Sequence, residues 1–127
     1  MHKYNKSVLV VDDHAMSIKL LEQILTNEGF DVFSAPSGEE AITMVQDFKP
    51  DIVLLDIILA GINGYKTCQV LKVMSPDLPI IFLSTVADKE KGLQMGAVDY
   101  IIKPFQMQDV VYRVKKHLGI VADEPTA

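Results

Sequence analysis

The sequence predicts a doubly wound α/β domain in which helices cover both faces of a five-stranded parallel sheet. Five short apolar runs, rich in β-branched residues, alternate with segments whose apolar positions recur every three or four residues. Parallel strands need crossover connections, and these connections are nearly always right-handed. The chain has 127 residues, 49% of them hydrophobic, which suffices for one core. We therefore expect one domain made of five βα units in series.

The predicted elements follow one another closely, and each strand is followed by one helix. Helical spacing of apolar residues runs from Ser17 to Glu28, before the second strand, and from Met107 to Leu118, after the fifth. Ser37 and Glu40 form a capping box, which predicts the start of the second helix. The predicted strands are Ser7–Val11, Asp31–Ala35, Asp51–Leu55, Pro79–Leu83 and Asp99–Ile102.

The composition argues against several classes of protein. A net charge of −5 would repel the phosphate backbone of nucleic acids, so we expect no direct nucleic-acid binding by this segment. The single cysteine, Cys68, cannot form an internal disulfide, which favours a cytoplasmic location. The first apolar run is short and ends in two aspartates, so we expect neither a signal peptide nor a membrane segment.

Polar residues come directly after four of the five predicted strands. All strands of a parallel sheet end at the same edge, and open α/β folds bind their ligands there. We therefore expect these residues to meet at one place. They are Asp12 and Asp13 after the first strand, Asp56 after the third, Ser84 and Thr85 after the fourth, and Lys103 and Pro104 after the fifth.

The three aspartates predict a metal site. Carboxylates that lie close together raise one another's pKa values, and a bound cation removes that conflict. Oxygen ligands without a His or Cys spacing favour a hard ion, so we expect Mg2+ or Mn2+ rather than Zn2+. We expect Asp13 and Asp56 to bind the ion and Asp12 to hold its water ligands. His14 is interpreted as a local surface group, since a lone histidine usually is one.

The same group of residues predicts phosphoryl transfer. The transition state of this reaction carries negative charge on its equatorial oxygens, which positioned cations and hydrogen-bond donors stabilise. Asp56 can attack phosphorus and form an acyl phosphate. We expect Ser84 and Lys103 each to contact one phosphoryl oxygen and the metal ion to contact the third.

These signals resemble the receiver domain of two-component response regulators over nearly the whole chain. The acidic pair, the lone aspartate, Ser84 and a Lys-Pro-Phe sequence occur in the order typical of that family. The resemblance implies a flavodoxin-like (βα)5 fold with strand order 2-1-3-4-5. It also implies a metal contact from the Ile58 carbonyl and a cis peptide between Lys103 and Pro104. Tyr100 matches the family's switch aromatic, which turns inward when the Ser84 hydroxyl moves toward the phosphoryl group.

The resemblance further implies how the domain acts. A sensor histidine kinase or phosphotransfer protein would donate a phosphoryl group from phosphohistidine, and phosphorylation would change partner binding. Apart from self-phosphorylation and self-dephosphorylation at Asp56, we expect no enzymatic activity. Residues 1–120 would form the receiver domain, and residues 121–127 a tail or the start of a linker. A downstream output domain, a partner protein or a second phosphorylated copy would bind the fourth helix, fifth strand and fifth helix, with candidates Lys91, Tyr100, Tyr112 and Lys116.

Two residues depart from the family's pattern. Ala60 stands where many members have proline, which predicts a looser loop after Asp56. Thr85 stands where the family usually has alanine or glycine, and its branched side chain would narrow access to the phosphoryl group. We therefore expect partner-catalysed dephosphorylation to be slow.

Purely structural roles are open to the same residues. Asp12 and Asp13 could cap a helix, and Asp56 could begin a turn. Lys103 could be a solvated lysine, as most lysines are. Tyr100 could be a half-buried aromatic residue with a hydrated hydroxyl.

Two other functions compete with the switch. A magnesium-dependent hydrolase with an aspartyl nucleophile usually has a second acid two residues after that nucleophile, where this chain has Ile58. A flavin-binding electron carrier needs a phosphate-binding loop after the first strand, where this chain has acids. Both alternatives are therefore less well supported than the phosphoacceptor.

Overall fold

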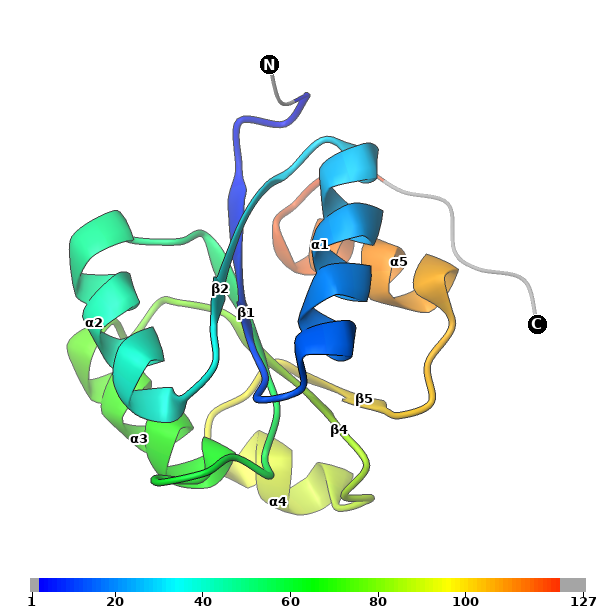
Figure 1. The fold of residues 1–127 in the computed structure, drawn as a ribbon. Coiled ribbons are helices and arrows are strands. Elements are labelled where there is room, and N and C mark those ends of the chain that lie inside the picture. The colour runs from blue at the N-terminus through cyan, green and yellow to red at the C-terminus, as the bar shows by residue number, and fades with distance from the viewer. Residues whose placement is uncertain (1–2, 122–127) are drawn as a thin grey trace.

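The structure, a computed structural model, describes residues 3–121 and contains one sheet of five strands flanked by helices. All neighbouring strands pair in parallel, in the order β2-β1-β3-β4-β5. The doubly wound, flavodoxin-like α/β fold predicted from the sequence is therefore confirmed (Figure 1).

The strands lie within one residue of the predicted positions. β3 begins one residue later than predicted, and the preceding Asp51 is bound to Ser7 at the start of β1. The Asp51 N–H donates to the Ser7 carbonyl at 3.0 Å, and the Asp51 carboxylate accepts the Ser7 N–H at 2.7 Å. β4 is shifted by one residue because Pro79 has no N–H to donate, whereas Ser84 still pairs with Ile102. The strands are β1 Ser7–Val11, β2 Asp31–Ala35, β3 Ile52–Leu55, β4 Ile80–Ser84 and β5 Asp99–Ile102.

Side-chain caps mark the start of three helices. Ser37 Oγ accepts the Glu40 N–H at 3.1 Å, as the predicted capping box requires. Asn63 and Asp88 cap α3 and α4 in the same way. His14 stands at the N-cap of α1 and makes no side-chain cap hydrogen bond. The helices are α1 Ala15–Glu28, α2 Gly38–Phe48, α3 Gly64–Met74, α4 Lys89–Gln94 and α5 Met107–His117.

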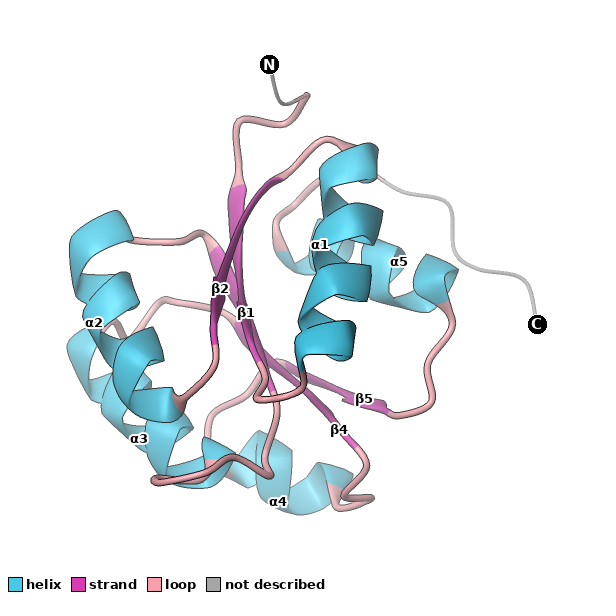
Figure 2. Ribbon diagram, in the orientation of Figure 1, coloured by secondary structure: helices cyan, strands magenta, loops and turns pink. Residues whose placement is uncertain are grey.

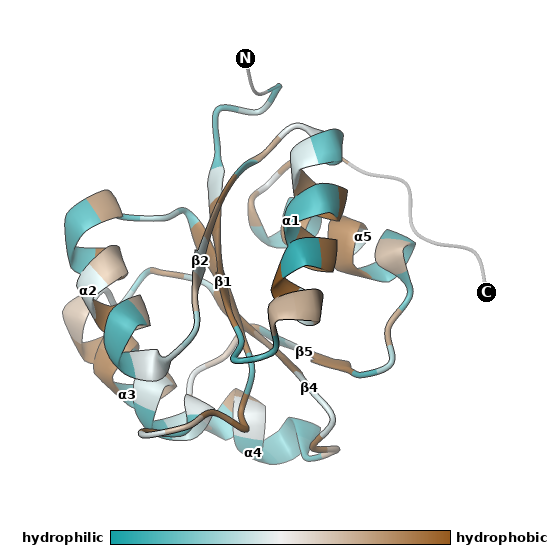
Figure 3. Cartoon of the chain, viewed as in Figure 1, coloured by the Kyte–Doolittle hydropathy of each residue, from teal (hydrophilic) through white to brown (hydrophobic). Residues whose placement is uncertain are grey.

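The sheet divides the hydrophobic core into two layers. α1 and α5 cover one face, and α2, α3 and α4 cover the other (Figures 1 and 2). Val8 and Val10 of β1 pack toward the first layer, and Leu9 and Val11 toward the second, as the alternation of side chains along a strand requires. In Figure 3, β1 carries the hydrophobic colour over most of its length, whereas the helices carry both colours. Alternate side chains of this central strand therefore supply the core of both layers.

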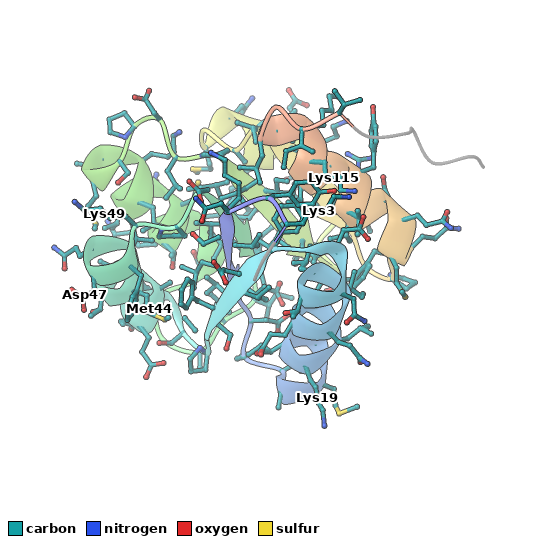
Figure 4. The ribbon with its side chains drawn as sticks, turned by 90° about the horizontal axis from the view of Figure 1, so that it is seen from above. Lys3, Lys19, Met44, Asp47, Lys49 and Lys115 are labelled. Atoms are coloured by element: carbon teal, nitrogen blue, oxygen red, sulfur yellow. The ribbon has the colours of Figure 1, made fainter. Side chains whose placement is uncertain are left out.

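The amino-terminal edge of the sheet is closed by a cluster around Tyr4. Its ring packs on Phe30 with centroids 5.0 Å apart, and the Nζ atoms of Lys3 and Lys115 each lie 5.3 Å from its centroid. Lys115 Nζ also lies 2.5 Å from Glu28 Oε1. Figure 4 looks onto this edge and shows Lys3 beside Lys115. These contacts join the N-terminal segment to α1 and α5.

Three further expectations concern the rest of the chain. Cys68 is fully buried, and burial raises the pKa of its thiol to about 11, so it behaves as a small apolar residue. Within residues 3–121, no helix is long and apolar enough to cross a membrane. Of the predicted tail at 121–127, only Val121 belongs to the described residues, and the remainder lies outside them.

Candidate functional site

The carboxyl ends of the strands bring the predicted polar residues to one edge of the sheet. The Asp56 N–H donates to the Val11 carbonyl at 2.9 Å, and the Lys103 N–H donates to the Ser84 carbonyl at 2.9 Å. These bonds extend the parallel ladder one step beyond the strands. The side chains of Asp56 and Lys103 consequently meet beside Asp12, at the lower end of β1 in Figure 1.

Lys103 joins two buried aspartates. Its Nζ lies 2.6 Å from Asp12 Oδ2 and 3.2 Å from Asp56 Oδ2. Asp12 is 2% exposed and Asp56 5%. Burial lowers the pKa of Lys103, but the hydrogen bond and charge of Asp12, together with those of Asp56, raise it above its usual value. The Lys103 amine is therefore positively charged at neutral pH. The peptide bond between Lys103 and Pro104 is cis, as the resemblance implied.

Asp13 and His14 form the open side of the site. The Asp13 side chain is 31% exposed and that of His14 68%. His14 Nδ1 lies 3.0 Å from Asp13 Oδ1 and 3.1 Å from Asp12 Oδ1, and the His14 N–H donates to the same Asp12 oxygen at 2.9 Å. The sequence interpretation gave His14 no chemical role. Its position directly after two acids was the signal that could have revealed this contact.

Four side chains offer atoms that could bind one metal ion. They belong to Asp12, Asp13, His14 and Asp56, and the offered atoms lie within 4.8 Å of one another. Three of the four donors are carboxylate oxygens, which hard cations such as Mg2+ and Mn2+ prefer. The three carboxylates also outnumber the single Lys103 amine. By donor type and by charge, these residues fit a divalent cation.

The loop after β3 is held close to Asp56. The Ile58 N–H donates to Asp56 Oδ1 at 3.3 Å. A Cβ on Gly64 would lie only 2.1 Å from the Asp56 carbonyl oxygen, so glycine allows the start of α3 to approach. Glu39 of α2 accepts the Ile62 N–H at 3.4 Å. Glu39 itself is exposed, and this hydrogen bond tethers a loop that the sequence predicted to be loose.

Ser84 lies at the same edge but is engaged elsewhere. Its side chain is fully buried, and its Oγ accepts the Val86 N–H at 3.3 Å. Among the hydrogen bonds of residues 3–121, none joins the Ser84 hydroxyl to Asp56 or Lys103. The neighbouring Thr85 is exposed. The structure thus places Ser84 beside Lys103 through its backbone carbonyl, while its hydroxyl holds the loop after β4.

Tyr100 is buried beneath α4. It is 4% exposed, its ring lies 5.9 Å from that of Phe82, and a Cβ on Gly92 would lie 2.6 Å from the Tyr100 ring. Its hydroxyl donates to the Val86 carbonyl, and burial raises its pKa. The alternative of a half-buried ring with a hydrated hydroxyl is therefore wrong. Ser84 and Tyr100 hold the N–H and the carbonyl of the same residue, Val86.

The other candidate residues for partner binding on α4 and α5 differ in exposure. Lys91 is exposed, and its Nζ lies 4.4 Å from the centroid of the Tyr65 ring on α3. Tyr112 is half-buried and Lys116 is exposed. Lys91 and Lys116 are therefore accessible to a partner, whereas Tyr100 is not.

Comparison with known families decides what kind of domain this is. The family model of the response regulator receiver domain matches residues 8–115, nearly the whole of the described chain. The chain belongs to that family. As a receiver domain it is a part of two-component signalling, and the resemblance drawn from its strand-end residues is confirmed.

Two curated relatives of this chain are longer than the chain itself. The DNA-binding response regulator MtrA of Mycobacterium tuberculosis is 41% identical over 128 aligned residues, which cover 98% of this chain and 56% of MtrA. The transcriptional regulatory protein YvrH of Bacillus subtilis is 38% identical over 118 residues, covering 90% of this chain and 49% of YvrH. This receiver domain thus spans about half the length of the curated relatives it matches.

Solved structures agree with the family assignment. A response regulator from Chloroflexus aurantiacus superposes with a TM-score of 0.86 and 38% identity, covering 91% of this chain and 98% of the other. CheY in a complex with CheX, BeF3 and magnesium from Borrelia burgdorferi gives a TM-score of 0.83 and 31% identity, covering 87% of each chain. Both similarities extend over most of the receiver domain.

Proposed function

We propose that this receiver domain is a phosphoacceptor switch in which Asp56 takes a phosphoryl group from a phosphohistidine donor in the presence of Mg2+. The observation that carries this proposal is the Lys103 amine held between the buried carboxylates of Asp12 and Asp56. A carboxylate nucleophile, a fixed positive charge and further acids are the parts that phosphoryl transfer needs. The magnesium in the Borrelia burgdorferi complex supports the choice of metal.

Four residues would hold the metal ion, which is Mg2+ or Mn2+. We assign Asp13 and Asp56 as carboxylate ligands, Asp12 as the acid that holds the ion's water ligands, and Ile58 as a carbonyl ligand. The close grouping of the acidic side chains supports the first three assignments, and the family resemblance supports the fourth. When bound, the ion would supply positive charge beside a phosphoryl oxygen.

The transfer step would exchange one bond to phosphorus for another. A carboxylate oxygen of Asp56 bonds to phosphorus while the P–N bond of the donor phosphohistidine breaks and the imidazole leaves. Later attack by water releases inorganic phosphate and restores the carboxylate. Lys103 would contact a phosphoryl oxygen throughout, and its 3.2 Å distance from Asp56 Oδ2 supports this role.

Ser84 and Tyr100 would pass the change to the rest of the domain. A Ser84 hydroxyl drawn to a phosphoryl oxygen would release the Val86 N–H that it now accepts. The loop after β4 would then keep its bond to the Tyr100 hydroxyl but lose its bond to Ser84, and both the loop and α4 could shift. The phosphoryl group would thereby favour the arrangement in which the face formed by α4, β5 and α5 binds its partner.

The partners follow from the family and from the length of the relatives. A sensor histidine kinase or phosphotransfer protein would donate the phosphoryl group. An output domain, a partner protein or a second phosphorylated copy would bind through Lys91, Tyr112 and Lys116. Since MtrA is a DNA-binding response regulator, we place any DNA binding by a full-length protein outside this segment, whose net charge is −5. The cytoplasmic location expected from the sequence belongs to the same proposal.

Chemical phosphorylation tests the proposal directly. The protein is incubated with a small acyl-phosphate donor and Mg2+, and intact mass spectrometry counts the phosphates added. We expect one phosphate on the wild type and none on Asp56→Asn. The matched control is Asp99→Asn, which alters another buried acid and should still accept phosphate. Unchanged labelling of Asp56→Asn would overturn the assignment.

A further inference from the structure

The ring nitrogen Nδ1 of His14 contacts both Asp12 and Asp13. It lies 3.1 Å from Asp12 Oδ1 and 3.0 Å from Asp13 Oδ1. The side chain is 68% exposed, so the contact is not forced by packing in the core. The inward-facing ring nitrogen therefore lies among the oxygens that would surround a metal ion.

The position of His14 is not explained by helix capping. It stands at the N-cap of α1, where serine, threonine, aspartate and asparagine are preferred because they accept a free helix amide. Its side chain makes no such bond. Instead its own N–H donates to Asp12 Oδ1 at 2.9 Å, which fixes the backbone beside the acids and turns the ring toward them.

The spacing of the four donors is close to that of a coordination sphere. Two ligand atoms on opposite sides of a Mg2+ ion are about 4.2 Å apart, since each bond is about 2.1 Å long. The offered atoms of Asp12, Asp13, His14 and Asp56 lie within 4.8 Å of one another. This spacing is only slightly wider than that of opposite ligands, so His14 lies within the region in which Asp13 and Asp56 would bind an ion and Asp12 would hold its waters.

We propose that His14 is an accessory nitrogen ligand, which widens the metal range of this site from Mg2+ toward borderline divalent cations such as Ni2+. Imidazole suits Zn2+, Cu2+ and Ni2+, whereas carboxylates suit Mg2+ and Mn2+. The inference rests on the proposed function in one respect, because it uses the same acids as metal ligands. It adds a residue and a metal class that the acids alone do not provide.

Calorimetric titration of the whole chain with Mg2+ and with Ni2+ tests the inference. His14→Gln keeps a polar side chain of similar size and removes the imidazole. We expect it to weaken Ni2+ binding about tenfold or more and to change Mg2+ binding less than about twofold. His117→Gln is the matched control, since its ring lies on α5 and contacts Asp99 at 2.8 Å. It should leave both affinities unchanged.

Pulsed electron paramagnetic resonance of bound Mn2+ gives an independent readout. We expect a nitrogen coupling in the wild type and in His117→Gln, and its loss in His14→Gln. If the nitrogen coupling is absent from the wild type, or if His14→Gln weakens Mg2+ and Ni2+ equally, His14 only positions the acids and the inference is overturned. Phosphorylation of Asp56 with Mg2+ would then still support the proposed function. A wild type that binds neither metal would overturn both.

Discussion

Two groups of buried charges lie at opposite edges of the sheet and differ in how their charges balance. At the carboxyl ends of the strands, Asp12 and Asp56 share the single amine of Lys103. At the start of β5, the Asp99 carboxylate lies 2.5 Å from Arg113 Nη1 and 2.8 Å from His117 Nε2. Arg113 also contacts Asp109 through its Nε at 2.8 Å, so this group has two acids and two basic partners. In the first group, acids outnumber cations. In the second group, each oxygen of the Asp99 carboxylate has its own basic partner.

This difference distinguishes a functional group of charges from a structural one. A buried carboxylate without full compensation destabilises the fold. The Asp99 group avoids that cost within the chain itself, so it ties β5 to α5 without a ligand. For the Asp12 and Asp56 group, we propose that a cation from solution supplies the missing positive charge. Excess negative charge, rather than burial of acids as such, marks the functional site.

The largest effect is expected from Lys103→Met. This change removes the amine that bridges two buried carboxylates, and we expect the free energy of unfolding to fall by about 3 kcal/mol without metal. Mg2+ binds only the folded protein, so it should restore more stability to the variant than it adds to the wild type. Urea unfolding with and without Mg2+ measures both quantities.

The control for this change is Lys115→Met. Lys115 has a similarly buried side chain, 12% exposed against 14% for Lys103, but its carboxylate partner is Glu28, and its Nζ also lies 5.3 Å from the centroid of the Tyr4 ring. The Lys115→Met variant should be destabilised by about 1 kcal/mol, and Mg2+ should not change its free energy of unfolding. Equal responses of the two variants to Mg2+ would contradict the proposed dependence of the site on a cation.

The next effect is a difference in sign between two matched substitutions. Asp99→Asn loses the charge that Arg113 and His117 share, and we expect a destabilisation of about 2 kcal/mol. Asp13→Asn removes a carboxylate that the neighbouring Asp12 and Asp56 repel, and we expect a stabilisation of about 1 kcal/mol without metal. Denaturant unfolding in a chelator measures both. Destabilisation of similar size in both variants would show that the two groups do not differ in charge balance.

The two groups should also lose stability at opposite ends of the pH scale. Burial raises the pKa of Asp99, but hydrogen bonds from His117 and the Tyr100 N–H, with the charge of Arg113, lower it below its usual value. Its contribution is therefore present above about pH 3.9 and is lost as the pH falls through the lower folded-state pKa. Because the pKa of Lys103 is raised in the folded state, its contribution to stability is present below about pH 10.4. That contribution is lost as the pH rises through the folded-state pKa.

Unfolding curves across pH test this assignment. Asp99→Asn should flatten only the acid limb of the stability profile, and Lys103→Met only the alkaline limb. A change on the opposite limb would mean that other groups govern the stability there.

The smallest effect concerns access to the phosphoryl group. Thr85 is exposed next to Ser84, and its branched side chain would stand in the path of a dephosphorylating partner. We expect Thr85→Ala to speed partner-catalysed loss of phosphate a few-fold, measured as the decay of the phosphorylated protein. Thr26→Ala, an exposed change on α1, is the control. Identical decay of Thr85→Ala and wild type would contradict the access role.

The fold was predictable because its signals are local. Each apolar run is long enough to cross the core once, and its β-branched residues favour a strand over a helix. The boundaries that moved, at Asp51 and Ser84, depend on hydrogen bonds to residues distant in the sequence, Ser7 and Lys103. Such bonds leave no local pattern, so an error of one residue was the expected limit.

The sequence predicted that Asp12, Asp56 and Lys103 lie together, but it did not predict the individual hydrogen bonds and ion pairs of the site. Parallel topology alone requires that Asp12, Asp56 and Lys103 lie at one edge, because every strand ends there. The contact of His14 with both acids and the tether from Glu39 to the β3–α3 loop depend on side-chain directions. Those directions are set by neighbours that spacing along the chain does not specify.

The amino-acid sequence by itself determined the order of the elements, the parallel sheet and the gathering of acids, hydroxyls and an amine at its edge. Those properties follow from hydrophobic periodicity and from the geometry of crossover connections. Only the tertiary structure decided that Lys103 is shared by two carboxylates and that Ser84 and Tyr100 both hold Val86. The physical reason is that hydrogen bonds and charge balance depend on distances of a few ångströms, which exist only once the strands and helices have packed.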